Sequence, residues 1–172
     1  MCTTNNKDLD SMMRVLRDHG MNKEKRYWHD IVGYNFRMTN LQASIGVAQT
    51  ERIEEILLER KNIEDAYKKE LMQVKELVFQ PNNLPNRNKV TWFVSMLLLK
   101  NRDLVIDKLK FEGIDARPFF YPLSIMPIYK PYVFSSQKSQ EIAKLGINLP
   151  TNNMINKSII LRIKAIIENN IN

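Results

Sequence analysis

The segment 33–39, which reads Gly-Tyr-Asn-Phe-Arg-Met-Thr, combines groups that can bind an anion. Asn35 carries an amide donor, and Arg37 carries a planar guanidinium with a fixed fork of donors. Both precede the predicted start of a helix at Thr39 or Asn40, where unpaired backbone N–H groups favour negative charge. The pattern predicts a site for a phosphorylated ligand. Spacing alone, however, favours a structural interpretation in which the two side chains only fix the turn into the helix.

The segment 117–123, Arg-Pro-Phe-Phe-Tyr-Pro-Leu, is a second candidate. Aromatic rings on a loop stiffened by proline can cover a ligand at a small cost in ordering entropy. Phe120 and Tyr121 are therefore candidate substrate contacts. The alternative is packing in the core, which is the favoured interpretation for Phe119 or Phe120 taken individually.

The two histidines are weaker candidates. His29 could act as a proton donor or as a hydrogen-bonding wall toward a substrate. A lone histidine beside Trp28 is more often structural. His19 lies in an Arg-Asp-His-Gly turn and is expected to be a local structural partner. No cluster of Cys and His predicts a metal site, and no glycine-rich phosphate loop is present among five glycines.

Length and composition bound the class of protein. The chain has 172 residues, of which 44% are hydrophobic and 26% charged, and this composition predicts a folded, soluble domain. The net charge of +7 is spread among acidic residues, which is typical of a solvated surface and argues against nucleic acid as the partner. The single Cys2 excludes an intrachain disulfide. No apolar run is long enough to cross a bilayer, so we expect a cytoplasmic location.

Hydrophobic spacing predicts the elements that position these groups. Asn5 or Asn6 caps a first helix whose buried positions are Leu9, Met12, Met13 and Leu16, and Gly20 ends it. Residues 21–34 are predicted as an ordered loop, and a long helix is predicted from residue 39 to about residue 74.

The C-terminal part predicts a small α+β unit with helices on one face of an antiparallel sheet. The predicted strands cover residues 77–79, 90–99 and 114–117, and the predicted helices cover 103–111, 136–145 and a segment that begins near Asn156. Between the last strand and these final helices, residues 118–132 are predicted as an extended, proline-rich loop.

The run GYNFRMTNLQASIG, followed by a glutamine three residues later, resembles the region just past the cofactor lysine in the DegT/DnrJ/EryC1/StrS aminotransferases. The segment MCTTNNKDLDSMMRVLRDHGM is similar to the strand, helix and turn that precede this region in the family. The resemblance implies an α/β fold, namely the C-terminal part of a fold-type I aminotransferase that depends on pyridoxal 5'-phosphate (PLP). It also implies three parts of the chain: 1–38 as the end of the large PLP-binding domain with an active-site loop, 39–74 as a long connecting helix, and 75–172 as a small C-terminal domain.

The resemblance further implies roles for individual residues. Asn35 would reach the PLP phosphate of the neighbouring subunit of a homodimer, and Arg37 would face a nucleotide-linked keto-sugar. Phe120 and Tyr121 lie in a segment that resembles the family's substrate-side loop, and His29 remains a candidate substrate contact on its own chemistry. Many relatives have a histidine where this sequence has Ser124, so that contact departs from the pattern.

PLP chemistry needs a Schiff-base lysine, and the family's lysine precedes a glycine-rich signature that this sequence does not contain. Lys7 does not match it, so we expect the chain alone to be inactive. Three hypotheses follow. The first is part of an aminotransferase, most like the perosamine-synthesising branch, that moves an amine from glutamate to a keto-sugar for surface polysaccharide such as lipopolysaccharide O-antigen. The second is a sugar 3-dehydratase of the same family, and the third is a noncatalytic remnant or partner subunit.

Overall fold

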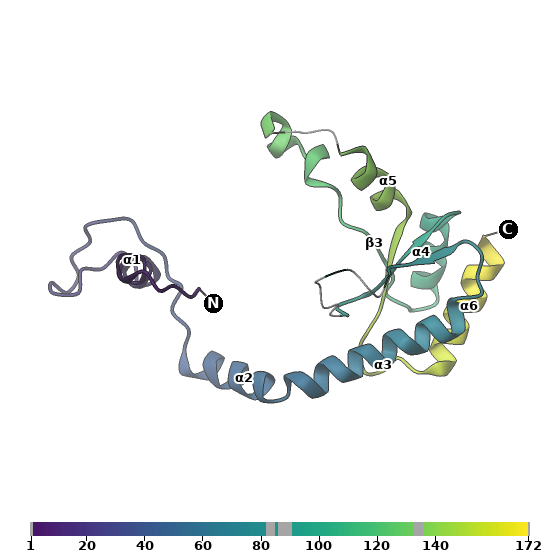
Figure 1. Ribbon diagram of the computed structural model, residues 1–172, viewed down its shortest axis with the longest axis horizontal. Coiled ribbons are helices and arrows are strands. Elements are labelled where there is room, and N and C mark those ends of the chain that lie inside the picture. Colours follow the sequence, from purple (N-terminus) through teal and green to yellow (C-terminus); the bar gives the residue numbers. More distant parts are fainter. Residues whose placement is uncertain (1, 82–84, 86–90, 133–135, 172) are drawn as a thin grey trace. The chain divides into compact units, whose positions relative to one another are not determined.

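The computed structural model describes residues 2–81, 85, 91–132 and 136–171. The chain divides into two compact units, Met1–Arg52 and Ile53–Asn172. The first unit contains helices α1 (Lys7–Arg17) and α2 (Asn40–Glu51), joined by the loop that carries the first candidate site (Figure 1). The second unit begins with helix α3 (Ile53–Leu71) and contains the sheet.

Helix α1 begins as the sequence predicts. The side-chain oxygen of Asn6 accepts hydrogen bonds from the backbone N–H groups of Asp8 and Leu9, which satisfies two donors at the helix start. The predicted buried face is wrong: Leu9 and Met12 are about half exposed, at 54% and 49%, and Met13 and Leu16 are only partly buried. The described part of this unit provides no second layer against that face.

The predicted long helix is interrupted at Arg52. Helix α2 opens with a capping box, in which Thr39 and Gln42 each bond the other's backbone N–H. The backbone at Arg52 has φ −103° and ψ 11°, which ends α2, and α3 begins at the next residue. Arg52 has neither proline nor glycine beside it, so the sequence contains no signal for this interruption.

The second unit contains a four-stranded antiparallel sheet in the order β1-β2-β4-β3. The strands are β1 (Leu77–Phe79), β2 (Val94–Leu98), β3 (Arg117–Pro118) and β4 (Gly146–Leu149). In β2, Val94, Met96 and Leu98 are buried on one face, while Ser95 points to the other face. This alternation confirms the antiparallel sheet that the sequence predicts.

Strand β4 is absent from the sequence prediction, although it lies between β2 and β3 and is buried along its whole length. It follows helix α5 (Gln137–Leu145) without a linker. Two of its four residues, Gly146 and Asn148, are poor strand formers, so residue preferences do not reveal it. The predicted strand at 114–117 is also shorter, since pairing is limited to β3.

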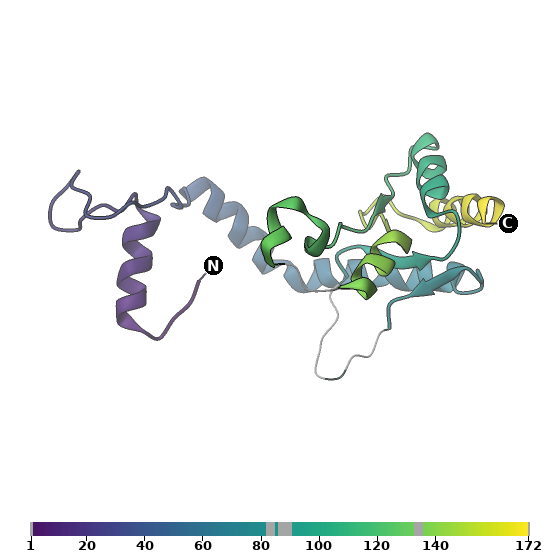
Figure 2. The same ribbon diagram turned by 90° about the horizontal axis from the view of Figure 1, so that it is seen from above.

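Helices cover both faces of the sheet, which corrects the expectation of a single covered face. Helices α4 (Arg102–Phe111) and α6 (Lys157–Asn170) lie on one side and α5 on the other (Figures 1 and 2). The core on the α4 and α6 side includes Tyr67 and Leu71 of α3, Leu109 of α4 and Ile163 of α6. None of the described helices has the length and apolar character needed to cross a membrane.

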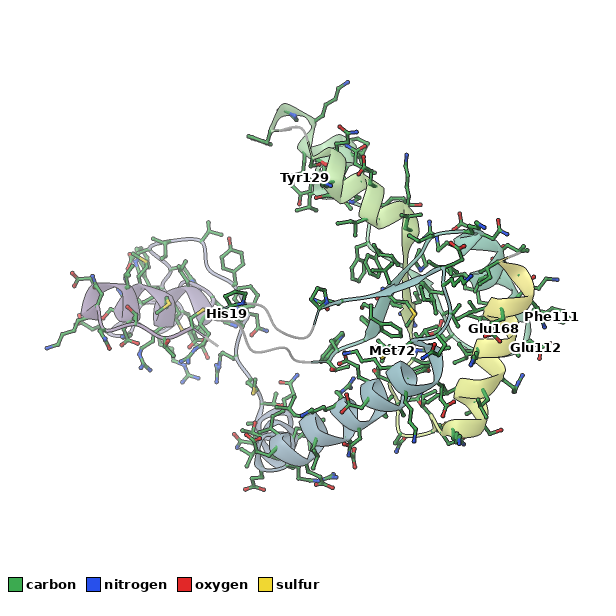
Figure 3. The ribbon with its side chains drawn as sticks, turned by 45° about the vertical axis from the view of Figure 1, so that its right-hand side comes forward. His19, Met72, Phe111, Glu112, Tyr129 and Glu168 are labelled. Carbon is green, nitrogen blue, oxygen red and sulfur yellow. The ribbon has the colours of Figure 1, made fainter. Side chains whose placement is uncertain are left out.

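A side-chain contact joins α6 to the C-terminal end of α4. The side chain of Arg162 in α6 donates to the carbonyl and to the carboxylate of Glu112, the residue that follows α4. Figure 3 labels Glu112.

The proline-rich segment, predicted as extended, instead forms two short 3-10 helices, η1 (Leu123–Ile125) and η2 (Pro127–Tyr132).

Ile163→Ala should destabilise the chain by about 2–5 kcal/mol, because Ile163 is fully buried and truncation leaves a cavity. Leu161 lies on the same helix and is 43% exposed, so Leu161→Ala should cost less than about 1 kcal/mol. Urea denaturation followed by circular dichroism measures both values. Equal losses in the two variants would contradict the assignment of the core face of α6.

Candidate functional site

The C-terminal end of α1 holds the segment that carries Asn35 and Arg37. Three backbone hydrogen bonds join the two: Tyr34 N to the Leu16 carbonyl (2.7 Å), His19 N to the Tyr34 carbonyl (2.9 Å) and Phe36 N to the Arg17 carbonyl (3.0 Å). Asp18 and Asn35 face each other in an antiparallel bridge. The rings of Tyr34 and Phe36 stack with centroids 5.1 Å apart, which keeps the segment extended.

Two glycines allow the loop to return to the helix end. Gly20 has φ +73°, and a Cβ there would lie 2.1 Å from the Ile31 carbonyl oxygen. A Cβ on Gly33 would lie 1.9 Å from the backbone nitrogen of Gly20. These distances leave no room for any side chain, so both positions require glycine. The close approach of the two backbones sets the path of residues 21–33.

Asn35 and Arg37 present free donors in this arrangement. The amide of Asn35 is exposed and makes no side-chain hydrogen bond within the described residues. Arg37 contacts the Asp18 carboxylate through Nη1 at 3.4 Å, and its side chain is 64% exposed. The opposite charge of Asp18 orients the guanidinium while leaving its other nitrogens open. Sequence reasoning did not identify Asp18 as this partner.

His29 is tied to the same helix end, because its Nδ1 lies 3.0 Å from the His19 carbonyl oxygen. Residues Met21 and His29 also form an antiparallel bridge. His19, which is labelled in Figure 3, has φ +63° and begins the turn after α1 that continues through Gly20. The predicted residues His29, Asn35 and Arg37 are thus all anchored on residues 18 and 19.

The carboxylate of Asp30 organises the tip of the loop. It accepts hydrogen bonds from Asn22 Nδ2 and Trp28 Nε1, both at 2.8 Å. These two donors hold the pKa of Asp30 below its ordinary value, because they stabilise the ionised form. The Lys25 ammonium lies 3.8 Å from the centre of the Trp28 ring. Trp28, the residue before His29, therefore helps to fix the structure of the loop tip.

The second predicted group lies in the second unit, on the loop after β3. Phe120 and Tyr121 are 83% and 74% exposed, so the core interpretation fails for Phe120. Phe119 packs instead on the backbone of Gly146, where an added Cβ would collide with its ring.

An apolar pocket of about 380 Å³ lies beside this loop and is lined by Phe119, Phe120, Pro122, Leu123 and residues of α5. Tyr121 is not part of the lining. Ser124 is, and its hydroxyl hydrogen-bonds that of Ser136 across the pocket wall. The sequence prediction found the loop but not α5 as its partner, because that pairing is not local in sequence.

Comparison with known proteins identifies the family. The sequence matches the DegT/DnrJ/EryC1/StrS aminotransferase family over residues 1–168. The chain therefore belongs to this family, and its fold is the C-terminal part of a fold-type I PLP-dependent aminotransferase.

Several curated relatives carry the name GDP-perosamine synthase. The protein from Caulobacter vibrioides is 38% identical over 173 aligned positions, which cover 98% of this chain and 47% of the relative. The protein from Vibrio cholerae is 36% identical and covers 83% of this chain and 40% of the relative. The chain thus spans less than half the length of these relatives and matches their C-terminal portion.

Solved structures share the fold. A Streptococcus pneumoniae protein assigned as a sugar aminotransferase, Spr1654, superposes in its PLP form with a TM-score of 0.82 at 21% identity. The match covers 98% of this chain and 46% of that structure. This similarity shows the fold alone.

Gly33→Ala should disrupt the contact between the loop and the end of α1, at a cost above about 1 kcal/mol, because its methyl group collides with the backbone of Gly20. Gly46 lies in α2 with open space around it, so Gly46→Ala should be neutral or stabilising by up to about 1 kcal/mol. Hydrogen exchange at the amides of His19 and Tyr34 reports the contact. Unchanged protection of these amides in Gly33→Ala would show that the crossing is not required.

The structure of the tip of loop 21–33 should depend on pH. Because the pKa of Asp30 is lowered, its contribution is fully present above the ordinary value of 3.8 and is lost as the pH falls through the lowered pKa. The NMR signal of the Trp28 indole N–H should shift toward its free position over that range. Asp30→Asn should remove this pH dependence, and an identical profile in that variant would contradict the role of the carboxylate.

Proposed function

We propose that this chain forms part of a PLP-dependent aminotransferase that transfers an amino group from glutamate to a nucleotide-linked keto-deoxy sugar. The product would serve the biosynthesis of surface polysaccharide such as O-antigen. The observation that carries the proposal is the family match over residues 1–168, together with the 38% identity to a GDP-perosamine synthase along almost the entire chain.

The residues before α2 fit the phosphate of PLP. Asn35 has an exposed amide with no protein partner within the described residues, and Arg37 retains donors beyond its one contact with Asp18. An amide donor and a guanidinium on a rigid segment suit an anionic oxygen cluster. We propose that Asn35 holds the cofactor phosphate and that Arg37 holds the sugar nucleotide.

Bound PLP supplies an electron sink that lets an amine move between carbon centres. We assign none of the lysines of this sequence to its anchor, so a second polypeptide segment must provide that lysine. In this proposal Asn35 acts across a homodimer interface on the site of the neighbouring subunit, and each subunit includes the segment that carries the lysine.

The aromatic loop contributes to the substrate side. Phe120 and Tyr121 are exposed, and Phe120 lines an apolar pocket. We propose that they cover the deoxy-sugar and exclude water from it. His29, oriented by the His19 carbonyl, is proposed to hydrogen-bond the substrate.

The test combines this chain with the part of the Caulobacter vibrioides relative that precedes the matched portion, both as separate polypeptides and as one fusion. With PLP, glutamate labelled with heavy nitrogen and a GDP-linked 4-keto sugar, mass spectrometry should detect labelled amino-sugar. The chain alone should give none. Transfer by the chain alone would disprove the assignment of the lysine, and a folded fusion without transfer would disprove the proposed activity.

Variants of the fusion distinguish the proposed role of Asn35 in cofactor binding from that of Arg37 in substrate binding. Asn35→Ala should weaken PLP binding about tenfold or more, because a hydrogen bond to a charged group contributes about 1.5–3 kcal/mol. Arg37→Met should raise the KM for the sugar nucleotide by a similar factor and leave PLP binding unchanged. Asn5→Ala, an exposed asparagine ahead of α1, is the matched control and should change neither.

A further inference from the structure

The imidazole of His29 has one nitrogen tied to the protein and one nitrogen open. Its Nδ1 lies 3.0 Å from the backbone carbonyl oxygen of His19. Its Nε2 makes no hydrogen bond to another residue that the structure describes, and His29 is exposed. The two ring nitrogens therefore have different surroundings, and only Nε2 is available to a ligand.

The contact with His19 fixes which ring nitrogen carries the hydrogen. A carbonyl oxygen has no hydrogen to donate, so Nδ1 must be the donor and the His19 carbonyl the acceptor. In a neutral imidazole only one of the two nitrogens is protonated. Nε2 then carries a lone pair, and it accepts hydrogen bonds. The backbone of His19 thus selects the Nδ1–H tautomer of the His29 ring.

The backbone holds both partners of this hydrogen bond in place. On the donor side, Met21 and His29 form an antiparallel bridge. On the acceptor side, the amide of His19 donates to the Tyr34 carbonyl at 2.9 Å. These contacts place the ring and the carbonyl independently of any ligand. The open nitrogen is therefore oriented in advance, and little ordering entropy remains to be lost on binding.

No acidic side chain occupies the open nitrogen within the part of the chain that the structure describes, since His29 makes no ion pair there. The carboxylate nearest in sequence, that of Asp30, accepts instead from Asn22 Nδ2 and Trp28 Nε1, both at 2.8 Å. The acid beside His29 is thus engaged by two other donors. Nε2 remains free to pair with a group of a ligand.

An accepting nitrogen selects the kind of group that it binds. A hydroxyl has a hydrogen to donate, whereas a keto oxygen and an ionised phosphate oxygen can only accept. Nε2 of the neutral ring therefore pairs with a hydroxyl and stays unpaired beside either of the other two groups. Arg37 has the opposite preference, because its guanidinium only donates. The two side chains suit different parts of one substrate.

We infer that His29 is held as the Nδ1–H tautomer and that its Nε2 accepts a hydrogen bond from a hydroxyl group of the keto-sugar. His29 is then a specificity-determining residue that favours a sugar with a hydroxyl at the contacted position. The tautomer follows from this chain alone, whereas the contact with the sugar rests on the proposed function.

Nitrogen NMR of the isotope-labelled full chain tests the tautomer. The sequence has two histidines, so His19→Asn leaves His29 as the only imidazole. Asparagine tolerates the positive φ of position 19, and the variant keeps the carbonyl that Nδ1 contacts. At a pH where the ring is neutral, Nδ1 should give the signal of a protonated nitrogen and Nε2 that of an unprotonated one.

The unsubstituted chain provides the same measurement if His19→Asn does not fold, because the His29 signals are those that disappear in His29→Asn. The chain unfolded in urea gives the reference for a free ring. A hydrogen on Nε2 in the folded chain, or the same ratio of tautomers in folded and unfolded chain, would overturn the inference.

Two substitutions distinguish the open nitrogen from the tied one. In His29→Asn the side-chain amide can still donate to the His19 carbonyl, but nothing replaces Nε2. In His29→Gln the longer side chain places an amide oxygen, which is an acceptor, near the position of Nε2. A merely structural role would favour the asparagine variant, and a role as acceptor would favour the glutamine variant.

Calorimetry on the fusion with the N-terminal part of the Caulobacter vibrioides relative measures the contact without requiring turnover. His29→Asn should weaken binding of the GDP-linked 4-keto sugar about threefold to tenfold, and His29→Gln should recover most of that loss. GDP without the sugar should bind equally to all three proteins. Equal affinities for the keto-sugar, equal losses in the two variants, or a matching loss for GDP would contradict the hydroxyl contact.

The inference and the proposed function fail by different results. Amino transfer with no effect of His29→Asn on binding refutes the contact and leaves the reaction standing. The predicted order of affinities in a fusion that transfers no amine refutes the reaction and leaves the contact standing.

Discussion

The close contact between the backbones at Gly20 and Gly33 is the constraint on which the first candidate site depends. Because neither position has room for a Cβ, the loop 21–33 must fold back on the end of α1. Residues 18 and 19 then become the common anchor for His29, Asn35 and Arg37. Asp18 has a further role, since its carboxylate orients a guanidinium that stays largely exposed. A rigid backbone with unpaired side-chain donors is the arrangement that an anionic ligand requires.

In the first unit a contact between two glycines fixes the loop. In the second unit, polar side chains of α3 fix the neighbouring segments. Arg60 joins the helix to the segments on either side of the sheet end, and the Tyr67 hydroxyl donates to the Pro150 carbonyl at 3.2 Å. Burial raises the pKa of Tyr67, so its hydroxyl stays a donor even at alkaline pH where an exposed tyrosine would ionise. Helix α3 therefore contributes to the core with one face and fixes these segments with its polar groups.

Family membership gives these features a common setting. The chain is a member of the DegT/DnrJ/EryC1/StrS aminotransferases and corresponds to less than half of its curated relatives. Asn35, Arg37, Phe120 and Tyr121, which the resemblance relates to the cofactor and the substrate, all have exposed side chains, and Arg37 also contacts Asp18.

The sequence by itself determined the elements whose signals are local. A cap at Asn5 or Asn6, a helix start at Thr39 or Asn40, the helix after Asn156 and the isoleucine face of α6 all follow from residues within one or two helical turns. The motif around Asn35 and Arg37 also identified the family. The tertiary structure alone decided the place of β4, the break at Arg52, the exposure of Leu9 and the partners Asp18 and Arg60. The place of β4 and the partners Asp18 and Arg60 depend on contacts between segments separated in the sequence, and neither residue preference nor periodicity encodes such contacts.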